Sequence, residues 1–215
     1  MTARIASIQI GRIAPLGPER VPSAFIKTGI AGPVLAGALG LAGDEQADLS
    51  VHGGPEKAIY AYSAGRYVDW AAAFPDLAER FVAGCMGENL TVEGMNEDGL
   101  CVGDVHAIGG ARLQVCQPRQ PCFKLALALG EPRLVKHMVR TGHSGWYYRV
   151  VQEGPIAPGD VPTLTERPNP DFGFARLVTI INRGGATVPE LRRLAAMPGL
   201  ASRIGQKARE ALEAA

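Results

Sequence analysis

The chain has 215 residues, a length typical of one large domain or of one domain with a small appendage. Hydrophobic residues make up 47% and charged residues 20%, as in an ordinary globular protein, and the net charge of +1 argues against nucleic acid polymers or membranes as partners. No apolar run is long enough to cross a bilayer, and the N-terminus lacks the apolar core of a secretory signal. Four scattered cysteines without CxxC spacing predict reduced thiols and a cytoplasmic location.

The first three quarters of the chain are rich in strand-like segments. Residues 5–10 alternate in hydrophobicity as a half-buried strand does, and residues 23–28 are its candidate partner. Residues 29–43 are dominated by Gly and Ala without a helical period and predict a loop. Further strands are expected at 57–62, 89–92, 146–152 and 161–165, and helices at 64–74, 123–129 and 132–140.

A pair of glycines gives the strongest local signal. Gly109-Gly110 separates two strand-like segments, 104–108 and 111–116, and predicts a β-hairpin. The second arm of this hairpin leads directly into a proline-rich segment that contains a cysteine.

The sequence changes after residue 166 from strand-like segments to a linker followed by helical segments. Residues 167–173 contain two prolines and a glycine, as a linker does, and helices are expected at 175–182, 188–197 and 200–214. We therefore predict a first domain over residues 1–166 and a three-helix domain over 174–215. The helical part is too small for a confident core of its own, so it is expected to pack on the first domain or on a second subunit, which would make a homodimer.

The cysteine segment is residues 117–124, QPRQPCFK. Each proline fixes its own φ and restricts the residue before it, so the segment is stiff and presents Cys122 in a set direction. Arg119 and Lys124 favour the thiolate form, which attacks electrophiles or binds a metal. A buried structural cysteine is the alternative interpretation.

Two further segments are candidates for binding chemistry. Residues 43–57, GDEQADLSVHGGPEK, place Asp44, Asp48, His52 and Lys57 around the turn Gly53-Gly54-Pro55, where backbone N–H groups can approach an anion. Residues 87–90, GENL, place Gly87, Glu88 and Asn89 at the start of a strand. Ordinary turn chemistry explains both segments equally or better, and no P-loop, Rossmann fingerprint or zinc-ligand spacing is present in the sequence.

Four segments in this order resemble the MOSC family, which is named after the C-terminal domain of molybdenum-cofactor sulfurase. They read GDEQADLSVHGGPEKAIYAY, GENL, VGDVHAIGGARLQVCQPRQPCFK and SGWYYRV. The stand-alone bacterial, YiiM-like branch also carries three helices after a proline-containing linker, so the resemblance covers nearly the whole chain. It implies an α+β, mainly β fold: a twisted β-barrel-like domain with peripheral helices, followed by the three-helix domain.

The resemblance also implies a molybdenum–pterin cofactor, with the Cys122 thiolate as the metal ligand. The implied cofactor-binding residues are His52, Gly53, Gly54, Lys57, Gly87, Glu88, Asn89, Arg119, Gln120, Cys122 and Lys124. Pyridoxal phosphate is not expected, because the sulfurase domain that uses it has no counterpart in this chain.

The implied reaction is the reduction of N-hydroxylated compounds, with hydroxylaminopurine-type bases as substrates: R–NHOH plus two electrons and two protons gives R–NH₂ and water. The sequence shows no flavin, haem or iron–sulfur motif, so a separate reductase is expected to donate the electrons. The catalytic candidates are Cys122, His52 and Asp48, with Asp44 as a further candidate for the proton donor.

Two alternatives remain open on the sequence alone. The first alternative to the reductase is a non-catalytic module that carries the cofactor or sulfur on Cys122. The second is a metal-independent enzyme in which His52 activates Cys122 as a nucleophile.

Overall fold

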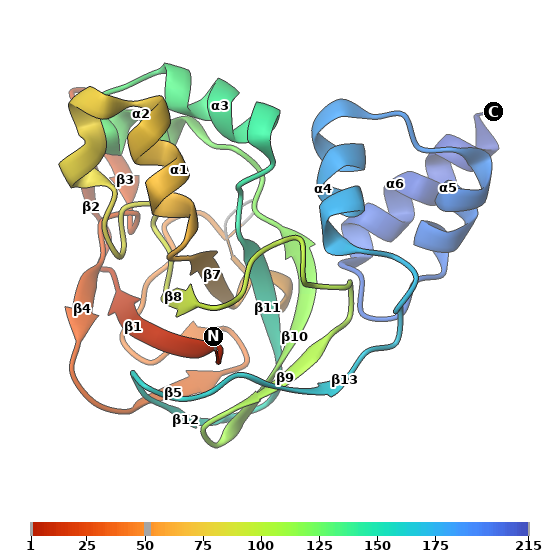
Figure 1. Ribbon diagram of the computed structural model, residues 1–215, viewed down its shortest axis with the longest axis horizontal. Helices are drawn as coiled ribbons and strands as arrows, with labels where there is room; N and C mark the ends of the chain where they lie inside the picture. Colours follow the sequence, from red (N-terminus) through yellow and green to blue (C-terminus); the bar gives the residue numbers. More distant parts are fainter. Residues whose placement is uncertain (1, 50–52, 215) are drawn as a thin grey trace.

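The computed structural model describes residues 2–49 and 53–214 (Figure 1). Its strands are β1 (Arg4–Ile10), β2 (Ala14–Leu16), β3 (Val21–Ser23), β4 (Thr28–Ile30), β5 (Val34–Gly37), β6 (Gly40–Leu41), β7 (Ile59–Ser63), β8 (Leu90–Glu93), β9 (Val105–Ile108), β10 (Ala111–Pro118), β11 (Trp146–Gln152), β12 (Gly154–Ile156) and β13 (Thr163–Glu166). Its helices are α1 (Arg66–Ala73), α2 (Phe123–Leu129), α3 (Arg133–Thr141), α4 (Phe174–Arg183), α5 (Val188–Ala195) and α6 (Ser202–Glu213), with two short 3₁₀ helices, η1 (Pro55–Lys57) and η2 (Pro75–Arg80).

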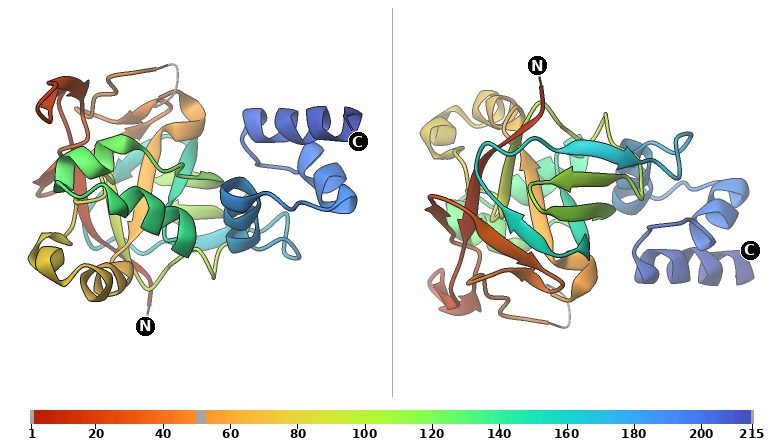
Figure 2. Two further views of the ribbon diagram at one scale, coloured as in Figure 1. Left: turned by 90° about the horizontal axis from the view of Figure 1, so that it is seen from above. Right: turned by 90° about the horizontal axis from the view of Figure 1, so that it is seen from below.

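One eight-stranded sheet organises the molecule. Its strand order is β13-β9-β10-β11-β7-β8-β1-β4, and only the pairing of β7 with β8 is parallel. The sheet curls, with α1, α2 and α3 at one end and α4, α5 and α6 beside it (Figures 1 and 2). The α+β, mainly β, barrel-like fold expected from the sequence is therefore confirmed. No helix within the described ranges is long and apolar enough to cross a membrane.

The predicted hairpin sets the position of the cysteine segment. β9 and β10 pair antiparallel across Gly109-Gly110, with Ala111 opposite Ile108. Gly109 has a φ of +53°, and an added Cβ would meet the backbone oxygen of Pro155 at 2.6 Å, so a side chain is excluded there. β10 ends at Pro118 and α2 begins at Phe123, which leaves Cys122 on the short connection between a strand and a helix.

The prediction of a loop at residues 29–43 is wrong. This segment contains the end of β4 and all of β5 and β6. Val34 and Ala36 face the core from β5, whose backbone pairs with β12 and β6. Strands are predicted from alternating large side chains, but backbone pairing does not require them. The Gly- and Ala-rich sequence therefore gave no signal for these short strands.

The strand predicted at 23–28 is also misplaced. β3 ends at Ser23, and the partner of β1 is β4, with Ile8 opposite Ile30. The strands β2 and β12 were not predicted, because three residues are too few to show an alternating pattern.

Two hydrophobic clusters form the core. The larger cluster joins the inner face of the sheet to the C-terminal helices through Phe174, Leu177, Val178 and Leu194. The smaller cluster lies under α1, α2 and α3 and is built around Trp70, which is fully buried. The three C-terminal helices therefore share a continuous core with the sheet.

An ion pair between the buried carboxylate of Asp104 and the exposed Arg167 fixes the segment that leads to these helices. The carboxylate of Asp104 is fully buried and accepts two hydrogen bonds from the Arg167 guanidinium, at 2.9 and 2.8 Å, and one from the Cys101 N–H at 2.8 Å. Two residues later, the Asn169 amide donates to the backbone oxygens of Val102 and Pro198. The connection between sheet and helices is thus held by specific polar contacts.

We predict that Asp104→Asn lowers the free energy of unfolding by about 2 kcal/mol, because it leaves Arg167 without its buried partner. Urea denaturation measures this change. The matched control is Glu166→Gln, which removes the exposed partner of Arg112 and should cost less than about 0.5 kcal/mol. Equal effects of the two variants would contradict the prediction.

Candidate functional site

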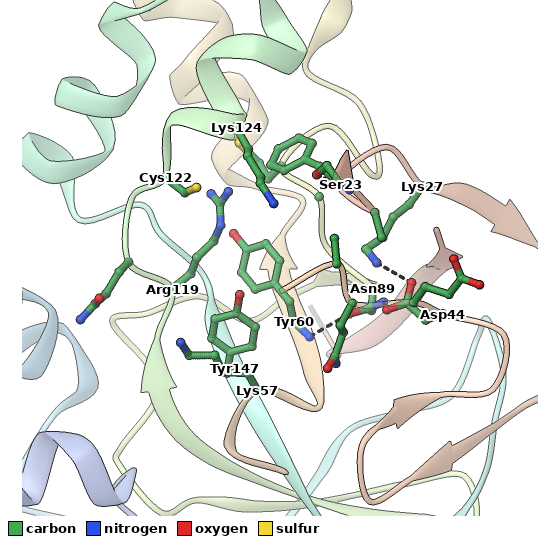
Figure 3. Close-up of a pocket in the computed structure, with 18 residues that line it drawn as sticks. Ser23, Lys27, Asp44, Lys57, Tyr60, Asn89, Arg119, Cys122, Lys124 and Tyr147 are labelled. Carbon is green, nitrogen blue, oxygen red and sulfur yellow. Dashed lines mark hydrogen bonds and ion pairs between the residues drawn. The ribbon is translucent and has the colours of Figure 1, made fainter. Parts of the chain in front are cut away.

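A cavity of about 100 Å³ opens beside the cysteine segment (Figure 3). Its wall is built from five parts of the chain: the β3–β4 connection, the loop after β6, the end of η1 with β7, the loop before β8, and the β10–α2 connection with β11. The residues that line it include Lys27, Asp44, Lys57, Tyr60, Gly87, Asn89, Arg119, Gln120, Cys122, Lys124 and Tyr147.

A second cavity, of about 330 Å³, adjoins the first. The two share Lys57, Gln120, Cys122 and Tyr147, and the second adds Phe123 and, from α6, Arg203. Cys122 therefore lies where the two cavities meet.

The thiol of Cys122 is the most available for chemistry. Cys122 is half-buried, has extended backbone angles (φ −134°, ψ 142°) and stands at the N-cap position of α2. Burial raises the pKa of the Cys85 and Cys101 thiols, and raises the pKa of Cys116 to about 12. The three other cysteines are therefore held as thiols at neutral pH.

Arg119 places a buried positive charge against this thiol. The residue is 6% exposed, and its guanidinium lies 5.5 Å from the ring centre of Phe25 and 5.2 Å from that of Tyr60. Figure 3 shows the guanidinium beside the Cys122 sulfur. No ion pair among residues 2–49 and 53–214 involves Arg119.

The aromatic wall around Arg119 is neutral. Burial raises the pKa of Tyr60 and of Tyr147, so both remain protonated phenols at neutral pH. Rings attract the guanidinium through their faces but do not cancel its charge. The arrangement leaves a buried positive charge at the cavity wall, which favours the binding of an anionic group.

The side chains of Lys27, Asp44 and Asn89 form a polar network on the wall of the first cavity. Lys27 Nζ lies 2.5 Å from Asp44 Oδ1, and the two side chains are 6% and 5% exposed. Asn89 donates from Nδ2 to Asp44 Oδ2 at 2.8 Å and accepts from the Tyr60 N–H at 3.1 Å. The network fixes a buried ammonium and a buried carboxylate side by side at the cavity wall.

Glu88 supports the wall from behind. It is fully buried and accepts hydrogen bonds from the Tyr67 hydroxyl, the N–H groups of Gly84 and Met86, and the Thr91 hydroxyl. These contacts hold the loop so that its neighbours Gly87 and Asn89 face the cavity. Gly87 has a φ of +77°, and an added Cβ would lie 3.0 Å from the Phe25 ring.

The structure brings together eight of the residues predicted from the sequence. Those that line the first cavity are Asp44, Lys57, Gly87, Asn89, Arg119, Gln120, Cys122 and Lys124, whereas Glu88 is buried behind its wall. Gly53 and Gly54 precede η1 and are not among the lining residues. Asp48 is exposed and does not line either cavity, and His52 lies outside the described residues.

Sequence reasoning missed Lys27, Tyr60 and Tyr147 as cavity residues. Tyr60 and Tyr147 are cross-strand partners on β7 and β11, so only the register of the sheet brings them together. Lys27 carries no motif of its own. In the part of the chain that the structure describes, no group of three or more His, Cys, Asp or Glu side chains is placed to hold a metal ion.

Comparison with known proteins identifies the family. The family model described as MOSC domain matches residues 48–162, a little over half of the chain. The chain is a member of the MOSC domain family. Its curated relatives include the protein YiiM of Escherichia coli (strain K12), 42% identical over 145 residues, and a protein named "Reductase" from Gibberella moniliformis, 36% identical over 197 residues.

Solved structures place the chain in the YiiM-like part of the MOSC family. The crystal structure of YiiM from Geobacillus stearothermophilus matches with a TM-score of 0.81 at 34% identity and covers 98% of this chain and 99% of that chain. That of YiiM from Escherichia coli gives 0.79 at 28% identity, with 94% of each chain covered. The matched regions cover 67% of this chain and 64% of the curated E. coli relative, and 90% of this chain and 35% of the Gibberella relative.

We predict that iodoacetamide modifies Cys122 before the other three cysteines at pH 8. With a pKa of about 12, Cys116 has a thiolate fraction of only about one in 10,000 at this pH. Mass spectrometry of peptides over time measures the order. In Cys122→Ser the fast phase should vanish, and a fast phase that persists in this variant would contradict the assignment.

Proposed function

We propose that this MOSC protein binds a molybdenum–pterin cofactor in the first cavity, with the Cys122 thiolate as the protein ligand to the metal. The observation that carries the proposal is the pairing of one accessible thiol with a buried guanidinium that has no acidic partner among the described residues. Thiolate is a ligand suited to a soft metal centre, and the Arg119 guanidinium lies beside the Cys122 sulfur.

The other residues fit an anionic, flat group. Lys57 and Lys124 add positive charge to the wall, and the absence of a side chain at Gly87 leaves room beside Phe25. Asn89 is held by its contacts with Asp44 and Tyr60, so its position on the wall is fixed before anything binds. We propose Gln120 as a further polar contact at the boundary of the two cavities.

When bound, the cofactor would supply a two-electron redox step. We propose that the reaction is the reduction of N-hydroxylated compounds, with hydroxylaminopurine-type bases as the substrate class, in which R–NHOH, two protons and two electrons give R–NH₂ and water. Support comes from membership of the MOSC family and from a relative that is named a reductase. A separate reductase is proposed as the electron donor.

The departing hydroxyl must be protonated, so a side chain on the wall of the first cavity must donate a proton to it. We propose that Lys27 carries this proton at Nζ, which lies 2.5 Å from Asp44 Oδ1. Asp48 and His52, which precede η1 in the sequence, stay candidates for proton donation. The Lys27–Asp44 pair is preferred because both of its side chains line the first cavity.

We predict that protein made in a host with active cofactor synthesis contains near-stoichiometric molybdenum and that Cys122→Ser retains less than about a tenth of it. Elemental analysis measures the metal, and Cys85→Ser, which changes a half-buried cysteine outside the cavity lining, is the matched control. Molybdenum absent from the wild type would overturn the proposal. If the protein contains molybdenum but does not reduce a hydroxylaminopurine when a chemical electron donor is supplied, it is a cofactor carrier instead.

We predict that Lys27→Met lowers kcat about 100-fold while molybdenum content stays unchanged, because it removes the proposed proton donor. The matched control is Lys136→Met, which changes an exposed lysine on α3 and should leave kcat unchanged. Steady-state assays across pH with a chemical electron donor measure the effect, and far-UV circular dichroism confirms folding. An unchanged kcat in Lys27→Met would exclude Lys27 as the donor.

A further inference from the structure

One exposed aromatic side chain stands directly after the proposed metal ligand. The chain has six phenylalanines, five tyrosines and two tryptophans, and all of them lie in the part that the structure describes. Among these residues only Phe123 is exposed, with 55% of its surface accessible. The packing of α2 does not depend on this ring, because the same helix is attached through its buried Leu125 and Leu129. The ring of Phe123 is therefore available to a ligand.

Phe123 lines the second cavity, together with Cys122 and Tyr147. The volume of this cavity, about 330 Å³, falls within the range of small-molecule sites, roughly 300–1,000 Å³. Cys122 also lines the first cavity, so a molecule in the second cavity would lie next to the thiol. The second cavity is thus placed to hold a substrate.

The wall of the second cavity combines flat groups with polar ones. Tyr147 contributes an aromatic ring, and burial raises the pKa of its phenol, which stays neutral at neutral pH. Arg203 contributes a planar guanidinium, a group that stacks on rings. The amides of Gln117 and Gln120 can donate and accept hydrogen bonds. A flat heterocycle with polar atoms on its edge matches this combination.

Glu56 holds two parts of this wall in place. Its carboxylate accepts from the Ser202 N–H at 2.9 Å and from the Arg149 guanidinium at 2.7 Å. Its backbone oxygen accepts from the Gln117 amide at 2.8 Å. Since Ser202 immediately precedes Arg203, the contact joins the α6 side of the cavity to the sheet side. The wall is therefore ordered before a ligand binds, which lowers the entropic cost of binding.

We infer that Phe123 stacks on the ring of the substrate in the second cavity and thereby determines specificity for N-hydroxylated compounds that carry a flat heterocycle. The identity of the heterocycle, a purine-type base, rests on the proposed function. Aromatic side chains stack on bases through the π-face that every base presents. Stacking on Phe123 would also remove the exposed face of this ring from water.

Isothermal titration of the cofactor-free full-length chain with 6-N-hydroxylaminopurine tests the stacking contact. Phe123→Ala should weaken binding about tenfold or more, as loss of base stacking does, whereas Phe123→Trp keeps an aromatic face and should bind within about threefold of the wild type. The matched control is Val68→Ala, which changes an exposed apolar residue of α1 that lines neither cavity and should leave binding unchanged. Equal binding by the wild type and Phe123→Ala, or none by the wild type, would overturn the inference.

Steady-state kinetics of cofactor-loaded protein with a chemical electron donor separate this inference from the proposed function. Phe123→Ala should raise the KM for 6-N-hydroxylaminopurine about tenfold and leave kcat within about twofold, because stacking holds substrate and transition state alike. The KM for acetohydroxamic acid, which has an N-hydroxyl group but no ring, should not change. An unchanged KM for the purine in an active enzyme would refute the stacking contact and leave the proposed reaction intact. Purine binding that is lost in Phe123→Ala, by a protein that contains no molybdenum, would refute the proposed metal ligand and support the stacking contact.

Discussion

A buried positive charge at Arg119 is the constraint around which the site is arranged. Removing a guanidinium from water costs several kcal/mol unless other groups compensate, and here the compensation is partial. The rings of Phe25 and Tyr60 and the sulfur of Met138 contact the group, yet none of them carries a negative charge. The protein therefore retains a place where an anion is stabilised, and the proline-flanked connection after β10 puts the Cys122 thiol there.

The acidic residues near the site explain why this charge is left unbalanced. Glu88 and Glu56 accept hydrogen bonds from backbone N–H groups and hold segments of chain in place. Asp44 is paired with Lys27 and also accepts from the Gly11 N–H. Because these carboxylates are occupied by other donors, none of them forms an ion pair with Arg119 among residues 2–49 and 53–214.

Short-range sequence patterns predicted those parts of the fold and site that depend on residues close together in the chain. Strand β11 and helix α2 lie where the sequence predicted them, and the two prolines shortly before Cys122 made that thiol stand out. Features that depend on pairing between distant segments were hidden. The strand β5 is held by backbone bonds to β12, and Tyr60 meets Tyr147 only through the register of β7 and β11.

The C-terminal helices illustrate how a remote segment becomes part of a site. Their apolar faces bury Phe174 and Leu177 against the sheet, which supplies attachment without a fixed orientation. Directional contacts then set the orientation: Asp104 binds Arg167 at one end of the segment, and Glu56 binds Ser202 at the start of α6. Since the second contact adjoins both Lys57 and Arg203, the same hydrogen bonds that dock the helices also shape the electrostatics of the cavity. Loosening the contact between Glu56 and Ser202 would therefore move Arg203 relative to Lys57 at the wall of the second cavity.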